Sequence, residues 1–454
     1  MVESAEKTVR CRPLVPRNPL PLSQRLKAIR VYHTGQELFR ESGGPVTRVT
    51  LGPKWLSPPF VWVMSPSGAC DVLGRKDGSC DRTSVHREMR RLVGDNLASL
   101  PNEPWLSRKR TLQPLFSKQR VRTFSGHMAQ AAAMVAVGWR DGAQVDLDAE
   151  CRRLTMRALG RSVLGMDLDE RADALAEPLN IALSYIADRG TRPAPLPRWL
   201  PTPARRRARA ADAAMHRLAN DILQACRADP TRDAPLVNAL IGATDPTTGQ
   251  ALSDRDICNE PKAFMAAGHD TTATTLAFAL WALGHRRDLQ DKVAEETADI
   301  GDRELTPDDV PRLGYTVQVL HEALRLCPPV PLAGRMAVRD IEVDGYRVEA
   351  GNMVLVGIYA MHRDPSLWEK PLVFDPDRFS PENSSGRDRW QFIPFGGGPR
   401  SCIGDHFAML ESTLALGTII RMIEIRSLGD DFPLAVPFTM VAAAPIPARV
   451  CARS

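Results

Sequence analysis

The chain has 454 residues, of which 43% are hydrophobic and 25% are charged. This composition suits a soluble globular protein with a large core and excludes a disordered or collagen-like chain. The net charge of +5 is too small to indicate a nucleic-acid partner by itself. No run of about 18 apolar residues occurs, so we expect no transmembrane helix. The N-terminus lacks the apolar block of a signal peptide, which predicts a cytoplasmic protein.

The nine cysteines are odd in number and scattered, and none has CxxC spacing. This pattern favours neither a disulfide framework nor a zinc site. In a cytoplasmic protein we expect free thiols, most of them serving as small buried hydrophobes.

The predicted elements in the first half of the chain are mostly helical. Residues 1–30 are proline-rich and predict an irregular arm, and residues 46–51 and 60–64 predict a β-hairpin. Helical patterns then occupy residues 105–139, 148–163, 170–188 and 204–227. Five prolines interrupt residues 190–203, which therefore predict a loop between two helices.

The second half begins with the longest predicted helix, residues 254–286, which would span about 50 Å. Another helix should end near Leu326, because two prolines follow it. Residues 341–348 predict a hairpin around Asp344-Gly345. A glycine-rich loop then precedes a helix over residues 405–425, and the last 25 residues carry prolines and β-formers. The whole pattern predicts a mostly α fold with a small β part, in a single domain over residues 1–454.

One cysteine differs from the other eight. Residues 395–404 read FGGGPRSCIG, which places Cys402 at the end of a glycine-rich loop, just before a helix. Unpaired N–H groups and the positive dipole end of that helix stabilise a thiolate. Such a thiolate serves either as a nucleophile or as a metal ligand, and no base is evident for a nucleophile. The bland interpretation is a glycine-rich turn with a buried cysteine.

This loop resembles the haem-binding signature of the cytochrome P450 family, FxxGx(R/H)xCxG. The five matching residues are Phe395, Gly398, Arg400, Cys402 and Gly404. The resemblance is to the soluble, bacterial type of haem-thiolate monooxygenase. It implies the P450 fold and a b-type haem, with Cys402 as the axial thiolate ligand of the iron and Phe395 and Arg400 beside the haem.

An ExxR motif, Glu322 to Arg325, precedes a PDRF element that contains Arg378. Alone, the helical pair is typical of a solvated ion pair worth about 0.2–0.5 kcal/mol. The resemblance implies instead that these three residues form a buried ion triad. Its expected role is to lock the loop that presents Cys402.

The long predicted helix contains AGHDTT, residues 267–272, followed by two more threonines within three residues. This is poor helix material, and one interpretation is a simple kink caused by threonine back-bonding. The segment also resembles the oxygen-binding groove of the family. That resemblance implies that Asp270 and Thr271 are an acid–alcohol pair that organises water, and that Gly268 leaves room for dioxygen.

Haem propionates need cations or N–H donors as partners, and the resemblance implies three residues for this role. Trp105 begins a helix on which the family often places arginine or histidine four residues later, but this chain has Lys109 there. Lysine keeps the charge and lacks the bidentate fork of arginine. Arg335 matches another propionate-binding position.

Two basic stretches remain. Residues 105–122 hold six Lys or Arg and no acid, and the resemblance implies docking of an acidic ferredoxin or flavin-type electron donor, served by an NAD(P)H reductase. A solvated face is the alternative, and nucleic acid is a poor interpretation. The second stretch, Arg205, Arg206, Arg207 and Arg209, predicts a solvated surface.

The resemblance as a whole implies insertion of one oxygen atom into an apolar small molecule such as a lipid, steroid or terpenoid. Candidate pocket residues are Phe264, Ala267, Val330 and Leu332, and the AGHDTT form resembles members that act on fatty acids and other long apolar molecules. A haem-thiolate sensor and a peroxide-driven peroxygenase remain alternatives, and both have less need of Asp270 and Thr271. The sequence identifies neither the substrate nor the oligomeric state.

Overall fold

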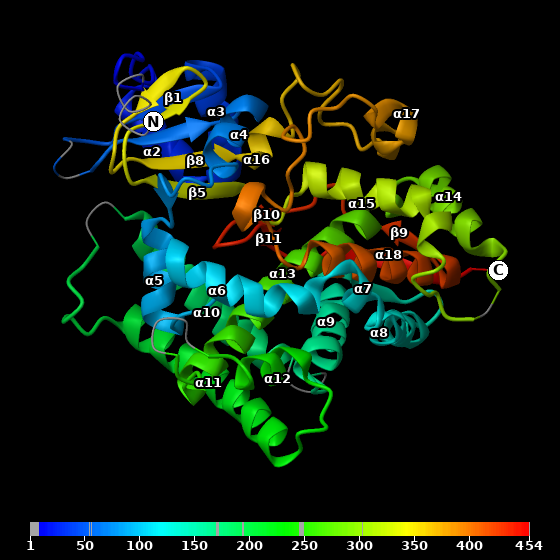
Figure 1. Ribbon diagram of the computed structural model, residues 1–454. Helices are drawn as coiled ribbons and strands as arrows, with labels where there is room; N and C mark the ends of the chain where they lie inside the picture. The colour runs from blue at the N-terminus through cyan, green and yellow to red at the C-terminus, as the bar shows by residue number, and fades with distance from the viewer. Residues whose placement is uncertain are drawn as a thin grey trace.

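The structure is a computed structural model that describes residues 9–53, 55, 57–168, 172–192, 195–244, 249–301 and 303–453. It confirms a mostly α fold with a small β part (Figure 1). The helices are α2 (Leu22–Arg30), α3 (Tyr32–Gly43), α4 (Pro66–Leu73), α5 (Ser84–Val93), α6 (Asn102–Leu112), α7 (Lys118–Arg122), α8 (Ser125–Gly138), α9 (Leu147–Leu159), α10 (Ala172–Thr191), α11 (Pro203–Ala228), α12 (Pro235–Ile241), α13 (Asp254–Gly284), α14 (Arg287–Ala298), α15 (Gly314–Leu326), α16 (Ile358–Met361), α17 (Pro381–Ser384) and α18 (Asp405–Met422). The strands are β1 (Val46–Val49), β2 (Phe60–Val63), β3 (Cys80–Asp81), β4 (Gln144–Asp146), β5 (Leu332–Ala337), β6 (Ile341–Val343), β7 (Tyr346–Val348), β8 (Met353–Gly357), β9 (Ile423–Ser427), β10 (Leu434–Ala435), β11 (Val441–Ala442) and β12 (Pro447–Ala452).

Helix α13 lies at the centre of the helical part, with α9, α11, α15 and α18 packed around it (Figure 1). The Ser253 side chain caps its first turn by accepting a hydrogen bond from Asp256 N, and Asp254 adds a negative charge at the positive dipole end. Its 31 residues span about 46 Å, as the sequence predicts to within two residues. This length lets one helix contribute to both the core and the site.

The main sheet has five strands in the order β1-β2-β8-β5-β3. The predicted hairpin of β1 and β2 is confirmed as an antiparallel pair, and β2 pairs in parallel with β8. The hairpin of β6 and β7 is also confirmed. Asp344 and Gly345 both have positive φ, 47° and 78°, which is the backbone that an Asp-Gly turn supplies.

Three predicted segments differ from the structure. The helical stretch 105–139 is divided among α6, α7 and α8. Helix α2 occupies Leu22–Arg30, so the first thirty residues are not an irregular arm throughout. The prolines of this region, the last of which is Pro21, all precede the helix and so do not interrupt it. Helix α18 ends at Met422, three residues early, because Ile423–Ser427 pair with β12 as strand β9.

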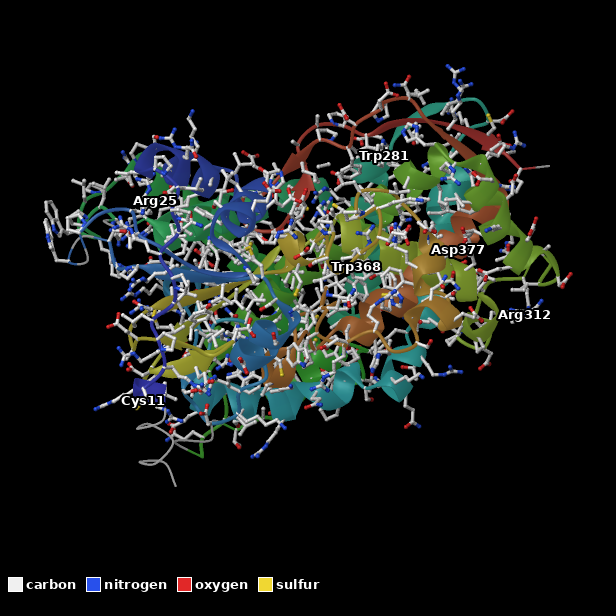
Figure 2. All side chains as sticks on the ribbon, turned by 90° about the horizontal axis from the view of Figure 1, so that it is seen from above. Cys11, Arg25, Trp281, Arg312, Trp368 and Asp377 are labelled. Atoms are coloured by element: carbon white, nitrogen blue, oxygen red, sulfur yellow. The ribbon has the colours of Figure 1, made fainter. Side chains whose placement is uncertain are left out.

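Most of the core is one cluster of apolar side chains from α8 to α15 and α18, and a second cluster lies under the main sheet. Figure 2 shows Trp368 inside the molecule, whereas Cys11 and Arg312 lie at its periphery. No two of the nine cysteines are joined in a disulfide. Among the helices of the described residues, none has the length and hydropathy needed to cross a bilayer.

Candidate active site

A cavity of about 1210 Å³ lies between the main sheet and the helical part. Apolar side chains of α10, α13 and the loop before β5 form much of its wall. The predicted site residues that line it are Phe264, Ala267, Gly268, Thr271, Val330, Leu332, Arg335, Phe395, Arg400 and Cys402. Of the predicted catalytic and cofactor-binding residues, Trp105, Lys109 and Asp270 are not among its lining residues. The structure therefore brings most of the predicted site together around one space.

One position in the loop that presents Cys402 has a backbone conformation that favours glycine. Gly398 has φ of +69°, and a β-carbon there would lie 1.9 Å from the carbonyl oxygen of Leu73. Cys402 N donates to Phe395 O at 2.9 Å, which closes the loop on itself. The loop thus packs directly against the end of α4, and this contact fixes the position of Cys402.

The Cys402 side chain is exposed, and the space to which it is exposed is the cavity. Protein surrounds the thiol otherwise, and this burial raises its pKa to about 11, while a hydrogen bond with the Gly404 backbone opposes the shift. A thiolate here therefore needs a cation beside it. A metal ion at the centre of a flat cofactor fits that need, and the glycine-rich loop leaves room for it.

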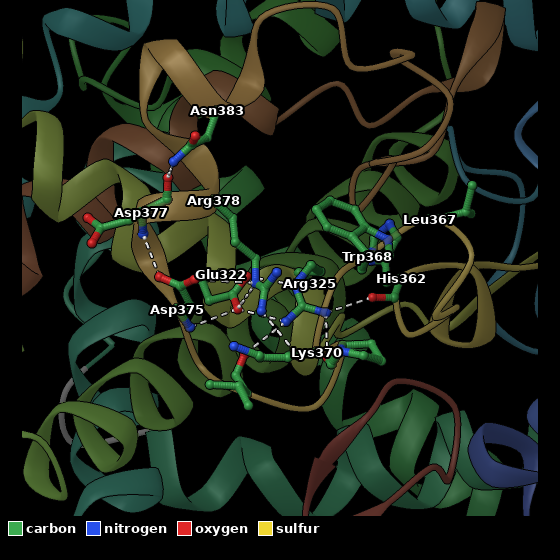
Figure 3. A network of polar contacts seen from close by, with 12 residues as sticks. Glu322, Arg325, His362, Leu367, Trp368, Lys370, Asp375, Asp377, Arg378 and Asn383 are labelled. Atoms are coloured by element: carbon green, nitrogen blue, oxygen red, sulfur yellow. Dashed lines mark hydrogen bonds and ion pairs between the residues drawn. The ribbon is translucent and has the colours of Figure 1, made fainter.

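The ion triad forms as the resemblance implies (Figure 3). Glu322 and Arg325 have fully buried side chains, joined by two hydrogen bonds of 2.6 and 2.7 Å. Arg378 Nε lies 3.4 Å from Glu322 Oε1. Asp375 N also donates to Glu322 at 3.0 Å.

Arg325 extends the same network to the backbone. It donates to the carbonyl oxygens of His362 and Pro371 at 2.8 and 2.7 Å. The network therefore connects α15 to residues 362–378. In the chain, this segment follows the main sheet and precedes the Cys402 loop.

A cluster of cations lies at one side of the cavity. Arg335 and Arg400 are its predicted members, and the structure adds Arg82, which lines the cavity beside the imidazole of His86. Burial, followed by repulsion among these cations, lowers the pKa of Arg82 and His86, and burial lowers that of Arg400 to about 10. The acid nearest to Arg400 is Asp81, at 3.6 Å. This surplus of positive charge fits the carboxylates of a bound ligand.

Trp105 and Lys109 lie behind this cluster. Arg400 packs over the Trp105 ring, 4.4 Å from its centre, which holds the guanidinium flat. Lys109 Nζ donates to the carbonyl oxygen of Pro399 at 2.6 Å. In this structure Lys109 therefore fastens α6 to the Cys402 loop, three residues before the cysteine.

The threonine-rich segment lies within α13, as predicted, although its residue types are poor helix formers. Thr271 Oγ donates to Ala267 O at 2.6 Å, and Thr275 Oγ donates to Thr271 O at 2.9 Å. Thr271 therefore bonds back to the preceding turn, and it also lines the cavity. A β-carbon on Gly268 would lie 3.1 Å from the Leu159 side chain, so this glycine also permits close packing of α9.

Asp270 points away from Thr271, toward α9. Its carboxylate pairs with Arg152, whose Nε also donates to Asp148 at 2.7 Å. The Asp270 side chain is 4% exposed. The predicted acid–alcohol pair is thus adjacent in sequence but faces two different sides of the helix, and Arg152 holds the acid.

The basic stretch of residues 105–122 divides into two groups. Arg108 points inward and pairs with the buried Glu260 at 2.7 Å, and Lys109 is used by the loop. The other four, Arg110, Lys118, Arg120 and Arg122, are exposed. Because Arg122 pairs with Asp308, the other three of these exposed residues supply most of the charge for a docking surface.

Sequence reasoning missed Arg82, His86 and Arg152. Arg82 and His86 follow the two-residue strand β3, which has no recognisable pattern of its own. Arg152 follows Asp148 by four residues, and this spacing predicts only an ordinary helical ion pair. The spacing gives no sign of the second contact, with Asp270.

Comparisons with known proteins agree with this geometry. A sequence profile of the family described as Cytochrome P450 matches residues 13–452. Cyclooctat-9-en-7-ol 5-monooxygenase of Streptomyces melanosporofaciens is 30% identical over 76% of this chain and 76% of its own length. Pentalenene oxygenase of Streptomyces avermitilis is 30% identical over 76% and 78%.

A solved structure shares the fold. The crystal structure of the cytochrome P450DA heme domain matches with a TM-score of 0.84 and 27% identity, covering 98% of both chains. The profile match spans nearly the whole chain, and the cavity holds the signature cysteine and the cations that such proteins need. The chain therefore belongs to the cytochrome P450 family and is a haem-dependent monooxygenase.

Proposed function

We propose that the cavity holds a b-type haem with Cys402 as its axial thiolate, and that the enzyme oxidises an apolar, terpenoid-like substrate. The presence of Cys402 and of apolar side chains of α13 in the wall of one cavity supports this proposal. Arg82, Arg335 and Arg400 would bind the two propionates. When bound, haem supplies the activation of O2 that the protein's own side chains cannot perform.

The protein's contribution is to position water and protons beside the substrate. The Thr271 hydroxyl donates its hydrogen to Ala267 O, so its lone pairs face outward as an acceptor for a water molecule. That water would be fixed against the cavity wall, where it can pass a proton toward the reacting oxygen.

Asp270 is the proposed source of those protons. Because it pairs with Arg152, it must turn away from α9 to reach the Thr271 side of the helix. The ion pair would then regulate how often protons are delivered, and Arg152 would act as a positioning residue through Asp270.

The apolar wall supports the choice of substrate class. Phe264 stacks on Phe116 with ring centres 5.1 Å apart, and Leu179, Leu183 and Ile186 of α10 cover the opposite side. The named terpenoid oxygenases among the relatives are consistent with a multi-ring hydrocarbon rather than a charged metabolite. Fatty acids are the second class to test.

Electrons would come from a separate ferredoxin or flavin-type protein with its NAD(P)H reductase. Three exposed cations of the basic stretch, Arg110, Lys118 and Arg120, support an acidic partner, since opposite charges steer association and this steering weakens as salt is added. Asp270 and Thr271 favour this route over peroxide as the sole oxidant.

Two measurements test the proposal. Titration with terpene hydrocarbons, terpene alcohols, steroids and fatty acids should produce a low-to-high-spin absorption shift with the terpenoids. Turnover with a surrogate ferredoxin and reductase should exceed turnover with hydrogen peroxide. A shift confined to fatty acids contradicts the substrate class, and peroxide-only turnover contradicts the electron route.

A further inference from the structure

A lysine lies in the wall of the cavity where α11 packs against α13. Lys262 of α13 lines the cavity, and so does Met215 of α11. The neighbouring wall residues of α13, Ala263, Phe264 and Ala266, are apolar. Lys262 is the only charged residue among the cavity-lining residues of these two helices, both of which the structure describes in full. Its side chain is 3% exposed, so protein surrounds the charge.

This lysine has more donors than the protein around it has acceptors. Lys262 Nζ donates to Asp212 Oδ1 of α11 at 2.9 Å. An ammonium group has three N–H donors, and Lys262 makes no other hydrogen bond with the described residues. A buried N–H group without an acceptor costs free energy, and the cost is larger on a charged group. The described part of the protein thus leaves two donors of Lys262 for a molecule inside the cavity.

A fixed stretch of helix separates Lys262 from the proposed reaction centre. Thr271, which also lines the cavity, lies nine residues further along α13. At 1.5 Å per residue, this separation is about 13–14 Å along the helix axis. A molecule that contacts both residues must therefore be elongated, with a polar end at Lys262 and an apolar end beside Thr271.

We propose that Lys262 determines specificity by binding an oxygen atom that the substrate already carries, and that the carbon to be oxidised lies at the opposite end of the molecule. This inference rests on the proposed function and narrows its terpenoid-like class to oxygenated members. Because Asp212 already supplies a counter-charge, a neutral alcohol or ketone fits the site better than a carboxylate, which would place two acids beside one lysine. A hydrogen bond to a charged group is stronger than one between neutral groups, so this contact favours one orientation of the substrate.

Spin-state titration of the haem-loaded protein with a matched pair of ligands tests this role. The pair is the diterpene hydrocarbon abietadiene and the corresponding alcohol, abietadienol. The wild-type protein should bind the alcohol about tenfold more tightly than the hydrocarbon. Lys262→Met keeps a long unbranched side chain but removes the donors. The preference for the alcohol should therefore disappear, while the affinity for abietadiene stays within about threefold.

Asp212→Asn is the matched control. It breaks the ion pair but leaves all three donors on Lys262, so the preference for the alcohol should remain. Lys262→Gln keeps neutral N–H donors and should show a smaller preference than wild type. The products formed from abietadienol are a second readout. Wild type should oxidise carbons remote from the hydroxyl, and Lys262→Met should give a mixture of positions.

Three results would overturn the inference. The first is an unchanged preference in Lys262→Met, or in Lys262→Gln where the methionine variant does not fold. The second is an equal loss of preference in Lys262→Met and Asp212→Asn, and the third is identical products from wild type and Lys262→Met. Each of these results, with abietadiene still bound, contradicts the role of Lys262 alone, whereas no spin shift with either ligand contradicts the proposed terpenoid substrate as well. Circular dichroism and the haem absorption spectrum of each variant distinguish these results from misfolding.

Discussion

Glu322→Ala tests the ion triad most directly. The substitution leaves Arg325 and Arg378 without the carboxylate that pairs with both, in a place where the acid and Arg325 have no solvent exposure. Removing one partner of a buried charge pair costs about 3–5 kcal/mol. At about 2.1 cal/mol/K per residue, unfolding 454 residues has an entropy of about 1 kcal/mol/K, so Tm should fall by about 3–5 °C.

The loss should also reach the haem site, because the triad ties residues 362–378 to α15 beside the Cys402 loop. Differential scanning calorimetry gives Tm, and the haem-to-protein absorbance ratio gives haem content. Asp188→Ala removes an exposed i,i+4 pair with Arg192 and should shift Tm by less than about 1 °C. Equal effects of the two substitutions would refute the reasoning that burial makes the triad important.

Further predictions concern single residues. Cys402→Ala should abolish the red-shifted band of the reduced carbon-monoxide complex that a thiolate ligand gives, as optical spectra of the haem-loaded protein can show. Thr271→Ala should keep haem and substrate shifts but lower product formed per NADPH oxidised, since a positioned proton-transfer group contributes about 10²–10⁴-fold in rate; an unchanged ratio contradicts its role. Gly398→Ala should reduce soluble haem-loaded protein, because its β-carbon meets Leu73 O, whereas a yield equal to wild type would show that the loop can shift. Burial lowers the pKa of His321 to about 4, so the unfolded chain binds a proton below about pH 6.5 that the folded protein does not. Stability should therefore fall by about 3 kcal/mol between pH 6.5 and 4, and His321→Leu should flatten that part of the Tm curve against pH.

Local patterns were sufficient for the parts of the site that lie within a few residues. Cys402 and its glycines form one continuous loop, and the Asp-Gly turn of β6 and β7 needs only two residues, so both could be predicted. The length of α13 also follows from its own sequence and cap.

Other parts depend on contacts between distant segments. The direction of Asp270 depends on Arg152, which is 118 residues away, and nothing near Asp270 encodes it. Arg82 and His86 acquire their role because β3 pairs with β5 and brings them beside Arg335. Lys109 was assigned to a propionate by its position in a motif, but its reach to Pro399 depends on how α6 packs.

The cation cluster at the cavity affects how the protein is made as well as what it binds. Arg82, Arg335 and Arg400 repel one another, and a dianionic cofactor would relieve that repulsion on binding. Relief of this repulsion therefore adds to the affinity for the cofactor. The same repulsion lowers the free energy of unfolding of the chain without cofactor. Chains that mature without cofactor should open more often and be cleaved faster by proteases, so cofactor supply would set the amount of protein that survives.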